Sequence, residues 1–404
     1  AAFRMNVHYW PVGIRSAQPL PLSHDQIAGM LLQDWAPLNA PPPASALFGW
    51  PAHLIQAQSD RGTFYWEMRE ELASTERQWK RVIAWMLGVV GARHLLAEEG
   101  YRWIAPVSAF FANAQHPARV YNWHRAFPPG AVVTQGFSRQ RANGTSRPRA
   151  TPLLPDYLAI RPRQVTGVRG WAAVEAKGTD DALHTPGKDN CPRSWRRQAW
   201  NLIVTLHGAR VPIPRHIVAA TRVNPGAKKW TTRCLHVRGW NSADRQPPEP
   251  PPQLAVEIAA AHLFGLCLSL GLVENAAALA AGVKARGGTV SQSAERRPRR
   301  DETLAAMAAS ADEELSSYSA PATGEDPETR RIHRTLVSPL GLAEVTIEPA
   351  TTMLIERLRS TDIDVASAAL DQADTRLNDL MATAGADAPD GTLLQDGLRI
   401  RFKL

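Results

Sequence analysis

Two short apolar runs decide how the rest of this chain is interpreted: Leu153-Leu154-Pro155-Asp156-Tyr157-Leu158-Ala159-Ile160 and Gly170-Trp171-Ala172-Ala173-Val174-Glu175-Ala176-Lys177. Each run presents an acid, and the second adds Lys177 two residues after its acid. Residues i and i+2 of a strand point to the same face of a sheet. We therefore expect Glu175 and Lys177 to project together, with Asp156 beside them on a neighbouring strand.

Two carboxylates and one ammonium suit a hard divalent cation such as Mg²⁺, which prefers oxygen ligands. A nearby lysine can orient or deprotonate a water molecule at such a site. An acidic residue stands two places before a lysine only once in the chain, at Glu175 and Lys177, although there are 38 acidic residues and seven lysines. The alternative is a surface strand whose glutamate and lysine form an exposed pair of little energetic consequence.

These residues resemble the motif of the PD-(D/E)xK nuclease superfamily, with Pro155-Asp156 at its first half and Glu175-Ala176-Lys177 at its second. The resemblance covers about residues 76–240, under half of the chain. It implies that Asp156, Glu175 and the backbone carbonyl of Ala176 hold Mg²⁺, with Mn²⁺ as a possible substitute. It also implies that Lys177 acts on the attacking water.

The fold that the resemblance implies is of the α/β type with mixed α+β character, a restriction-endonuclease-like core in the order αβββαβ. The sequence offers segments in that order. They are a helix over 76–99, strands over 101–107, 153–160 and 171–177, a helix over 193–207 and a strand over 216–223. A glutamate at the end of the first helix, Glu98 or Glu99, is a candidate further metal ligand. Gln198 in the second helix is a candidate to contact DNA or orient the site, and we group it with the catalytic residues.

The charge distribution indicates an anionic partner. Residues 131–246 hold 20 Lys and Arg against 6 Asp and Glu, whereas the whole chain has a net charge of +8, so the remainder is acidic. Such a concentration suits phosphate neutralisation, and arginine suits bidentate phosphate and guanine contacts. The expected nucleic-acid ligands are Arg147, Arg149, Arg193, Arg196 and Arg197.

Composition also limits which other classes of protein the chain can belong to, such as disulfide-rich, zinc-binding, secreted or membrane proteins. Three cysteines do not make a disulfide framework, and Cys234 with His236 is too small a set for a zinc site, so we expect a cytoplasmic protein. No signal-peptide pattern opens the given sequence. The longest apolar stretch, Ile258 to Val273, contains His262 and is shorter than a bilayer span, so it predicts a buried helix rather than membrane insertion.

The expected organisation has six segments. They are an irregular and helical N-terminal region (1–75), the nuclease-like core (76–245) with a basic insertion (108–150), a Pro-rich linker (246–253), a helical hairpin broken near Gly271 (254–284), a disordered linker (285–330) and a C-terminal α+β domain (331–404).

Two functions follow as hypotheses. The first is a Mg²⁺-dependent endonuclease, a hydrolase of phosphodiester bonds in DNA, acting in restriction or in defence against phage or plasmid. It would work as a homo-oligomer or with a defence-system partner protein. The alternative is a non-catalytic nucleic-acid-binding or scaffold protein that keeps a nuclease-like fold. The presence of all three of Asp156, Glu175 and Lys177 favours the enzyme.

Overall fold

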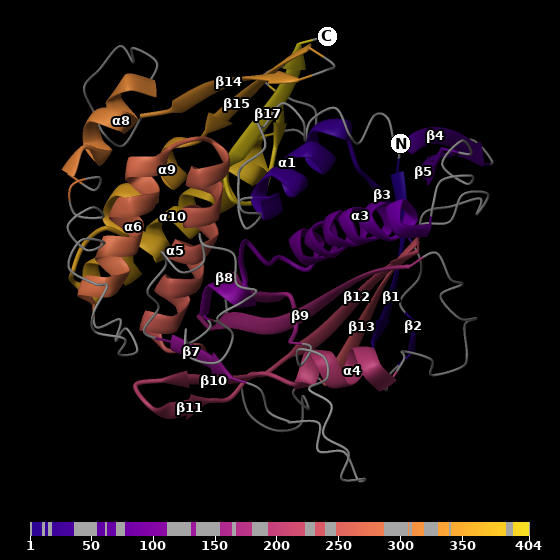
Figure 1. Cartoon of the computed structure of the whole chain (residues 1–404), viewed down its shortest axis with the longest axis horizontal. Helices are drawn as coiled ribbons and strands as arrows, with labels where there is room; N and C mark the ends of the chain where they lie inside the picture. The colour runs from indigo at the N-terminus through magenta and orange to yellow at the C-terminus, as the bar shows by residue number, and fades with distance from the viewer. Residues whose placement is uncertain are drawn as a thin grey trace.

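The computed structural model describes residues 2–9, 13–14, 18–35, 55–60, 63–69, 77–110, 131–134, 154–163, 167–179, 193–222, 231–238, 248–286, 306, 309–318, 330–338, 341–384 and 391–403. Over these residues the protein combines helices with mixed sheets, which confirms the mixed α and β class. Figure 1 shows the large sheet with helices on both of its faces and a second sheet near the C-terminus.

The large sheet has the strand order β4-β5-β1-β13-β12-β9-β8-β6. Its strands are β1 (Ala2–Tyr9), β4 (Ile55–Asp60), β5 (Thr63–Met68), β6 (Trp103–Pro106), β8 (Tyr157–Arg163), β9 (Arg169–Thr179), β12 (His216–Arg222) and β13 (Thr231–Arg238), with β2 (Gly13–Ile14) and β3 (Gln18–Pro21) paired to β1. Strand β8 runs antiparallel to both of its neighbours, β6 and β9, and β12 runs parallel to β9.

The N-terminal region differs from expectation. Strand β1 pairs in parallel with β13 and with β5, so this region extends the large sheet instead of forming an irregular cover. It also supplies one helix, α1 (His24–Trp35), which packs against α3 and α5. A capping box begins α1, since Ser23 Oγ accepts from the Gln26 N–H and the Gln26 side chain accepts from the Ser23 N–H.

Helix α3 (Arg77–Glu98) covers one face of β9 and β12, as expected for the helix over 76–99. Its residues Ala92, Leu95 and Leu96 share a buried cluster with Val174 and Ala176. The helix approaches β9 very closely, because a Cβ atom on Gly178 would lie 1.5 Å from the Ala84 carbonyl oxygen. Only glycine at this position permits that contact.

Helix α4 (Arg193–Trp200) lies on the opposite face, against β9 and β12 (Figure 1). The expectation of a helix to residue 207 was wrong, because the chain turns at Asn201 and Leu202 into a strand. That strand, β10 (Ile203–Leu206), forms a small sheet with β11 (Ala209–Val211) and with β7 (Ala131–Thr134) from the expected basic insertion. The run Leu-Ile-Val-Thr-Leu has β-branched residues that suit a strand better than a helix.

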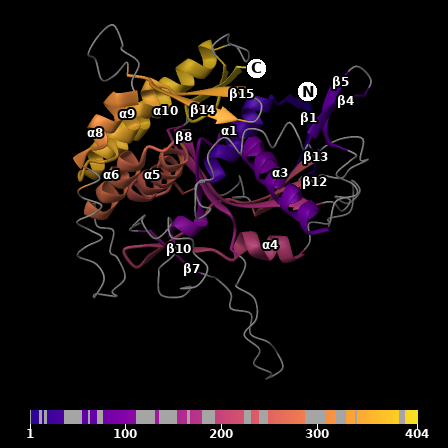
Figure 2. The same ribbon diagram turned by 45° about the horizontal axis from the view of Figure 1, so that its top comes forward.

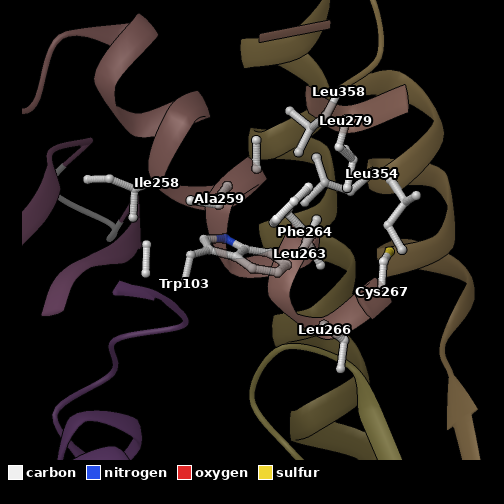
Figure 3. Close-up of a cluster of buried hydrophobic side chains, with 14 of the residues drawn as sticks. Trp103, Ile258, Ala259, Leu263, Phe264, Leu266, Cys267, Leu279, Leu354 and Leu358 are labelled. Carbon is white, nitrogen blue, oxygen red and sulfur yellow. The ribbon is translucent and has the colours of Figure 1, made fainter. Parts of the chain in front are cut away.

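Helices α5 (Pro252–Ser269) and α6 (Val273–Ala285) form the expected hairpin, and Gly271 between them has a φ of +74°. Helix α5 is apolar on all sides and therefore buried. By length and composition it is the one described helix that could cross a membrane, but 83% of its span is buried inside the protein, as in a core helix. Figure 3 shows Trp103 of β6 among apolar side chains of α5.

The C-terminal region forms a second sheet with the order β14-β15-β17-β16 and adds two helices. Its elements are β14 (Ile332–Ser338), β15 (Gly341–Ile347), α9 (Pro349–Arg357), α10 (Ile363–Thr383), β16 (Thr392–Leu393) and β17 (Leu398–Lys403), preceded by α8 (Ala311–Tyr318). Within the expected disordered linker, α8 packs on α6, and Leu315 is fully buried.

Buried ion pairs tie this region to the large sheet. Asp374 of α10 accepts from Arg102 (3.1 Å), Arg169 (2.6 Å) and the Trp103 indole (3.0 Å), and all four side chains are buried. Buried apolar residues of α5, α6, α9, α10 and the C-terminal sheet belong to the same core cluster as Trp103 of β6, Leu158 of β8 and Trp171 of β9. Figure 2 shows these helices stacked at the end of the large sheet where β8 lies.

Candidate active site

The pairing of β8 with β9 places Asp156 beside Glu175. Tyr157 pairs with Val174, so Asp156, one residue earlier, stands at the level of Glu175. Glu175 and Lys177 share one face of β9. This is the face of α4, because Val218, the partner of Glu175 in β12, packs against Ala199 of that helix. The structure therefore brings Asp156, Glu175 and Lys177 together as the sequence predicts.

The main chain holds Asp156 from three sides. Its N–H donates to the Val174 carbonyl (2.9 Å), and its own carbonyl accepts from the Val107 N–H (2.8 Å). Its carboxylate Oδ2 accepts from the Ala176 N–H (2.7 Å). The carboxylate is thus fixed against the same three residues, Glu175 to Lys177, that carry the second half of the motif.

Glu175 is a completely buried acid. Its side chain is 0% exposed, and burial raises the pKa of Glu175 to about 10, with the neighbouring Asp156 carboxylate as the second cause and Lys177 acting in the opposite direction. One oxygen, Oε1, lies against Lys177 Nζ, whereas Oε2 accepts no hydrogen bond from any described residue. With that pKa the Glu175 carboxyl keeps its proton near neutral pH, and a divalent cation is a partner that would stabilise its ionised form.

The carbonyl of Ala176 is aimed at the same place. In a strand, the N–H and the C=O of one residue point to the same side. The Ala176 N–H points to Asp156, so its carbonyl also points to the β8 side, at the level where the ladder of β8 has not yet begun. Two carboxylates and this carbonyl make an all-oxygen set that fits Mg²⁺ or Mn²⁺.

No group of three or more His, Cys, Asp or Glu side chains suited to a metal occurs within the described part of the chain. The set at Asp156 has only two such side chains. Its further oxygen comes from the main chain, and water commonly completes the shell of Mg²⁺.

Gln198 lies on α4 with its side chain turned inward, 7% exposed. Its amide Nε2 donates to the Leu154 carbonyl (2.9 Å), two residues before Asp156. It therefore anchors the segment that carries Asp156, which favours the orienting role over direct contact with DNA.

Glu98 is not brought to this group. It is exposed at the end of α3, the helix that covers the opposite face of β9. The next residue, Glu99, pairs with Arg161 (3.2 Å), which lies five residues, or about 17 Å, along β8 from Asp156. The tentative assignment of Glu98 as a ligand is therefore not supported by its position.

The structure describes three of the five arginines that the sequence predicts as nucleic-acid ligands. Arg147 and Arg149 lie outside the described residues. Arg193 is the first residue of α4, Arg196 is half-buried and Arg197 is exposed on the same helix. Arg197 is therefore accessible to a ligand on the outer side of α4.

Sequence reasoning missed two features of the site. One is the contact of Gly178 with α3, signalled only by a glycine directly after Lys177. The other is the exposed tip of the β10–β11 hairpin, His207 to Arg210, which lies close in sequence to α4. It was hidden because the helix expected over 193–207 included the strand β10 that leads into this tip.

No family model matches the sequence, and neither the curated proteins nor the solved structures compared with it give a match.

Proposed function

We propose that the protein is a metal-dependent endonuclease that hydrolyses phosphodiester bonds in DNA. The observation that carries this is the fully buried Glu175 carboxylate, held beside Asp156 and Lys177 with one oxygen lacking a donor among the described residues. A structural ion pair needs no second acid at its side. A cation site does, because the buried Glu175 carboxylate and the adjacent, half-buried Asp156 carboxylate become stable together when a divalent ion neutralises them.

The order and direction of the elements support the same proposal. Helix α3 is followed by the antiparallel strands β6, β8 and β9, then by α4 and by β12 parallel to β9. This is the αβββαβ order that the restriction-endonuclease-like fold implies, with the motif residues at its centre. We propose that residues 77–222 form such a core.

The residues then take separate roles. Asp156, Glu175 and the Ala176 carbonyl would hold Mg²⁺ or Mn²⁺. When bound, the ion polarises a phosphate oxygen and stabilises negative charge in the transition state. Lys177, a quarter exposed, can reach the solvent side of the site and accept or position a proton of the attacking water. Gln198 keeps the Asp156 segment in place through Leu154.

Cleavage assays on purified protein test the proposal. We expect DNA to be cut with Mg²⁺ or Mn²⁺, not with EDTA, and to be bound with little cutting in Ca²⁺, whose coordination is larger and more variable. Asp156→Ala and Lys177→Ala should each abolish cutting. Lys284→Ala, in helix α6, is the matched lysine control and should cut normally.

Undiminished cutting by Asp156→Ala and Lys177→Ala would reject the assignment. The competing function, a non-catalytic nucleic-acid-binding or scaffold protein, predicts a different result. The wild type and Lys177→Ala would then bind DNA equally, and neither would cut it with any divalent metal.

A cytoplasmic role in restriction or in defence against phage or plasmid is the setting we propose, with a homo-oligomer or a partner protein as the working form. Cells that express the wild type should resist phage infection or plasmid uptake, and cells that express Asp156→Ala should not. Equal sensitivity of the two strains would argue for another process.

A further inference from the structure

The outer side of helix α4 combines an exposed tryptophan with arginines. Two tryptophans lie on this helix, and they face opposite ways. Trp195 packs against Ala199 and Val218, whereas Trp200 is 39% exposed. Helical spacing puts Trp200 on the side of Arg196 and Arg197, four and three residues earlier. An indole kept partly in water beside guanidinium groups is available to a ligand.

The charge of this side is not compensated within its own segment. Residues 193–222 contain six arginines and no acidic residue. Arg197 on the helix and Arg210 on the β10–β11 hairpin are both exposed, and neither has an ion-pair partner among the described residues. Figures 1 and 2 show that the hairpin extends away from α4, and His207 at its tip contacts Gln253 at the start of α5. We therefore call only Arg196, Arg197 and Trp200, which all lie on the helix, the α4 surface.

This surface lies next to the candidate active site. Gln198, two residues and about 3 Å along the helix axis before Trp200, is bonded to the carbonyl of Leu154, close to Asp156. Gln198 and Trp200 point to different sides of the helix, inward and outward. A strand that crosses the outer side of α4 therefore passes within a few nucleotides of Asp156.

We propose that Trp200 is a stacking platform for an unpaired base, and that the α4 surface binds single-stranded nucleic acid beside the site of cutting. An indole needs a base whose face is not already covered. A single strand or a frayed end offers such a base, whereas a duplex must first be unstacked. Arginines on the same side neutralise the phosphates that flank that base. The inference relies on the proposed function only for the identity of the neighbouring site.

Binding assays in Ca²⁺, which separate binding from cutting, test it. The probes are a fluorescein-labelled mixed-sequence single strand and the duplex of the same sequence, measured by anisotropy. Trp200→Leu keeps an apolar side chain but removes the ring, so affinity for the single strand should fall at least about fivefold. Trp200→Phe should retain most of it, and the duplex affinity should change less than the single-strand affinity.

Trp85→Leu is the matched control, because Trp85 is 45% exposed on α3, which covers the opposite face of the large sheet. It should bind like the wild type. Arg197→Gln should lower the salt dependence of single-strand binding by about 0.7, the slope of one phosphate contact, whereas Trp200→Leu should leave that slope unchanged.

Equal single-strand affinity of Trp200→Leu and the wild type would overturn the inference, and so would an equal loss in Trp85→Leu. These results are independent of cutting. A protein that shows the Trp200 effect but never cuts DNA would contradict the proposed nuclease and leave the platform standing. A protein that cuts DNA without any Trp200 effect would contradict the stacking platform and support the proposed nuclease.

Discussion

The Lys177 ammonium contacts Oε1 of a Glu175 side chain that has no exposed surface, whereas a quarter of the Lys177 side chain is exposed. The lysine therefore reaches from the boundary of the site to an acid inside it. Lys177 lowers the pKa of Glu175, but burial and Asp156 raise it by more. Near neutral pH the Glu175 carboxyl therefore keeps its proton in the folded protein, and we expect the stability of the protein to depend on pH and, under the proposed function, on metal.

Glu175 should make the metal-free protein less stable as the pH rises. Its folded pKa of about 10 exceeds the ordinary value of 4.5, so between these values the unfolded state has lost a proton that the folded state keeps. The free energy of unfolding then falls with pH, by at most about 1.4 kcal/mol per unit for this group. Glu175→Gln should show a shallower fall between pH 5 and about pH 8 in urea denaturation. Equal slopes for the two proteins would contradict this account.

Asp156 and Lys177 should separate metal binding from chemistry. Asp156→Ala removes a proposed ligand, so Mg²⁺ should give no saturable heat in titration calorimetry. Lys177→Ala leaves the oxygens in place, so saturable binding should remain although cutting is lost. Loss of Mg²⁺ binding in both proteins would instead assign Lys177 to holding the site together.

Gln198 should act through Leu154 as a positioning residue. Gln198→Met keeps the length of the side chain but cannot donate, which should cost about 1 kcal/mol of stability. Because the segment that carries Asp156 then loses one of its anchors, at Leu154, we expect Mg²⁺ affinity and kcat to fall, while the KM for DNA changes little. Gln198→Lys can still donate to the carbonyl and should recover part of both. A lower affinity for DNA with unchanged Mg²⁺ affinity would favour a direct contact with the substrate.

Gly178 should tolerate no side chain. A Cβ atom there would lie 1.5 Å from the Ala84 carbonyl oxygen, so α3 must move off β9 directly behind Lys177. Gly178→Ala should therefore lower the free energy of unfolding by about 3 kcal/mol or more. Gly170→Ala in the same strand meets only the flexible Arg161 side chain, at 3.3 Å, and is the control. Similar losses in denaturant midpoint for the two variants would show that the close contact has no special cost.

Elements with strong local signals were predictable. The periodicity of α3, the apolar runs of β8 and β9 and the spacing of Glu175 and Lys177 each depend on residues near in sequence. Helix α10 and the turn at Gly271 were predictable for the same reason. The assignment of residues 201–207 failed because an apolar run of that length suits either a helix or a strand.

Contacts between residues that lie far apart in the sequence gave no such local signal. Nothing near Asp374 in the sequence indicates that it pairs with Arg102 and Arg169, and nothing near β1 indicates that it extends the sheet at β13. Likewise, the sequence Glu98-Glu99 at the end of α3 does not indicate whether these acids face the candidate site or the opposite face of the large sheet. The positions of Glu98 and of the C-terminal helices depend on tertiary packing, which no local pattern specifies.

The pairs of Arg102 and Arg169 with Asp374 also set an order of events during synthesis. Asp374 leaves the ribosome about 200 residues after Glu175. At about 5–20 residues per second, that interval is roughly 10–40 s. Until then Arg169 of β9 and Arg102, directly before β6, lack the acid that compensates their burial, which lowers the stability of the sheet that holds Glu175. A nascent chain on the ribosome should therefore carry no fully assembled site until synthesis has passed α10, and under the proposed nuclease function this delay would protect nearby nucleic acid.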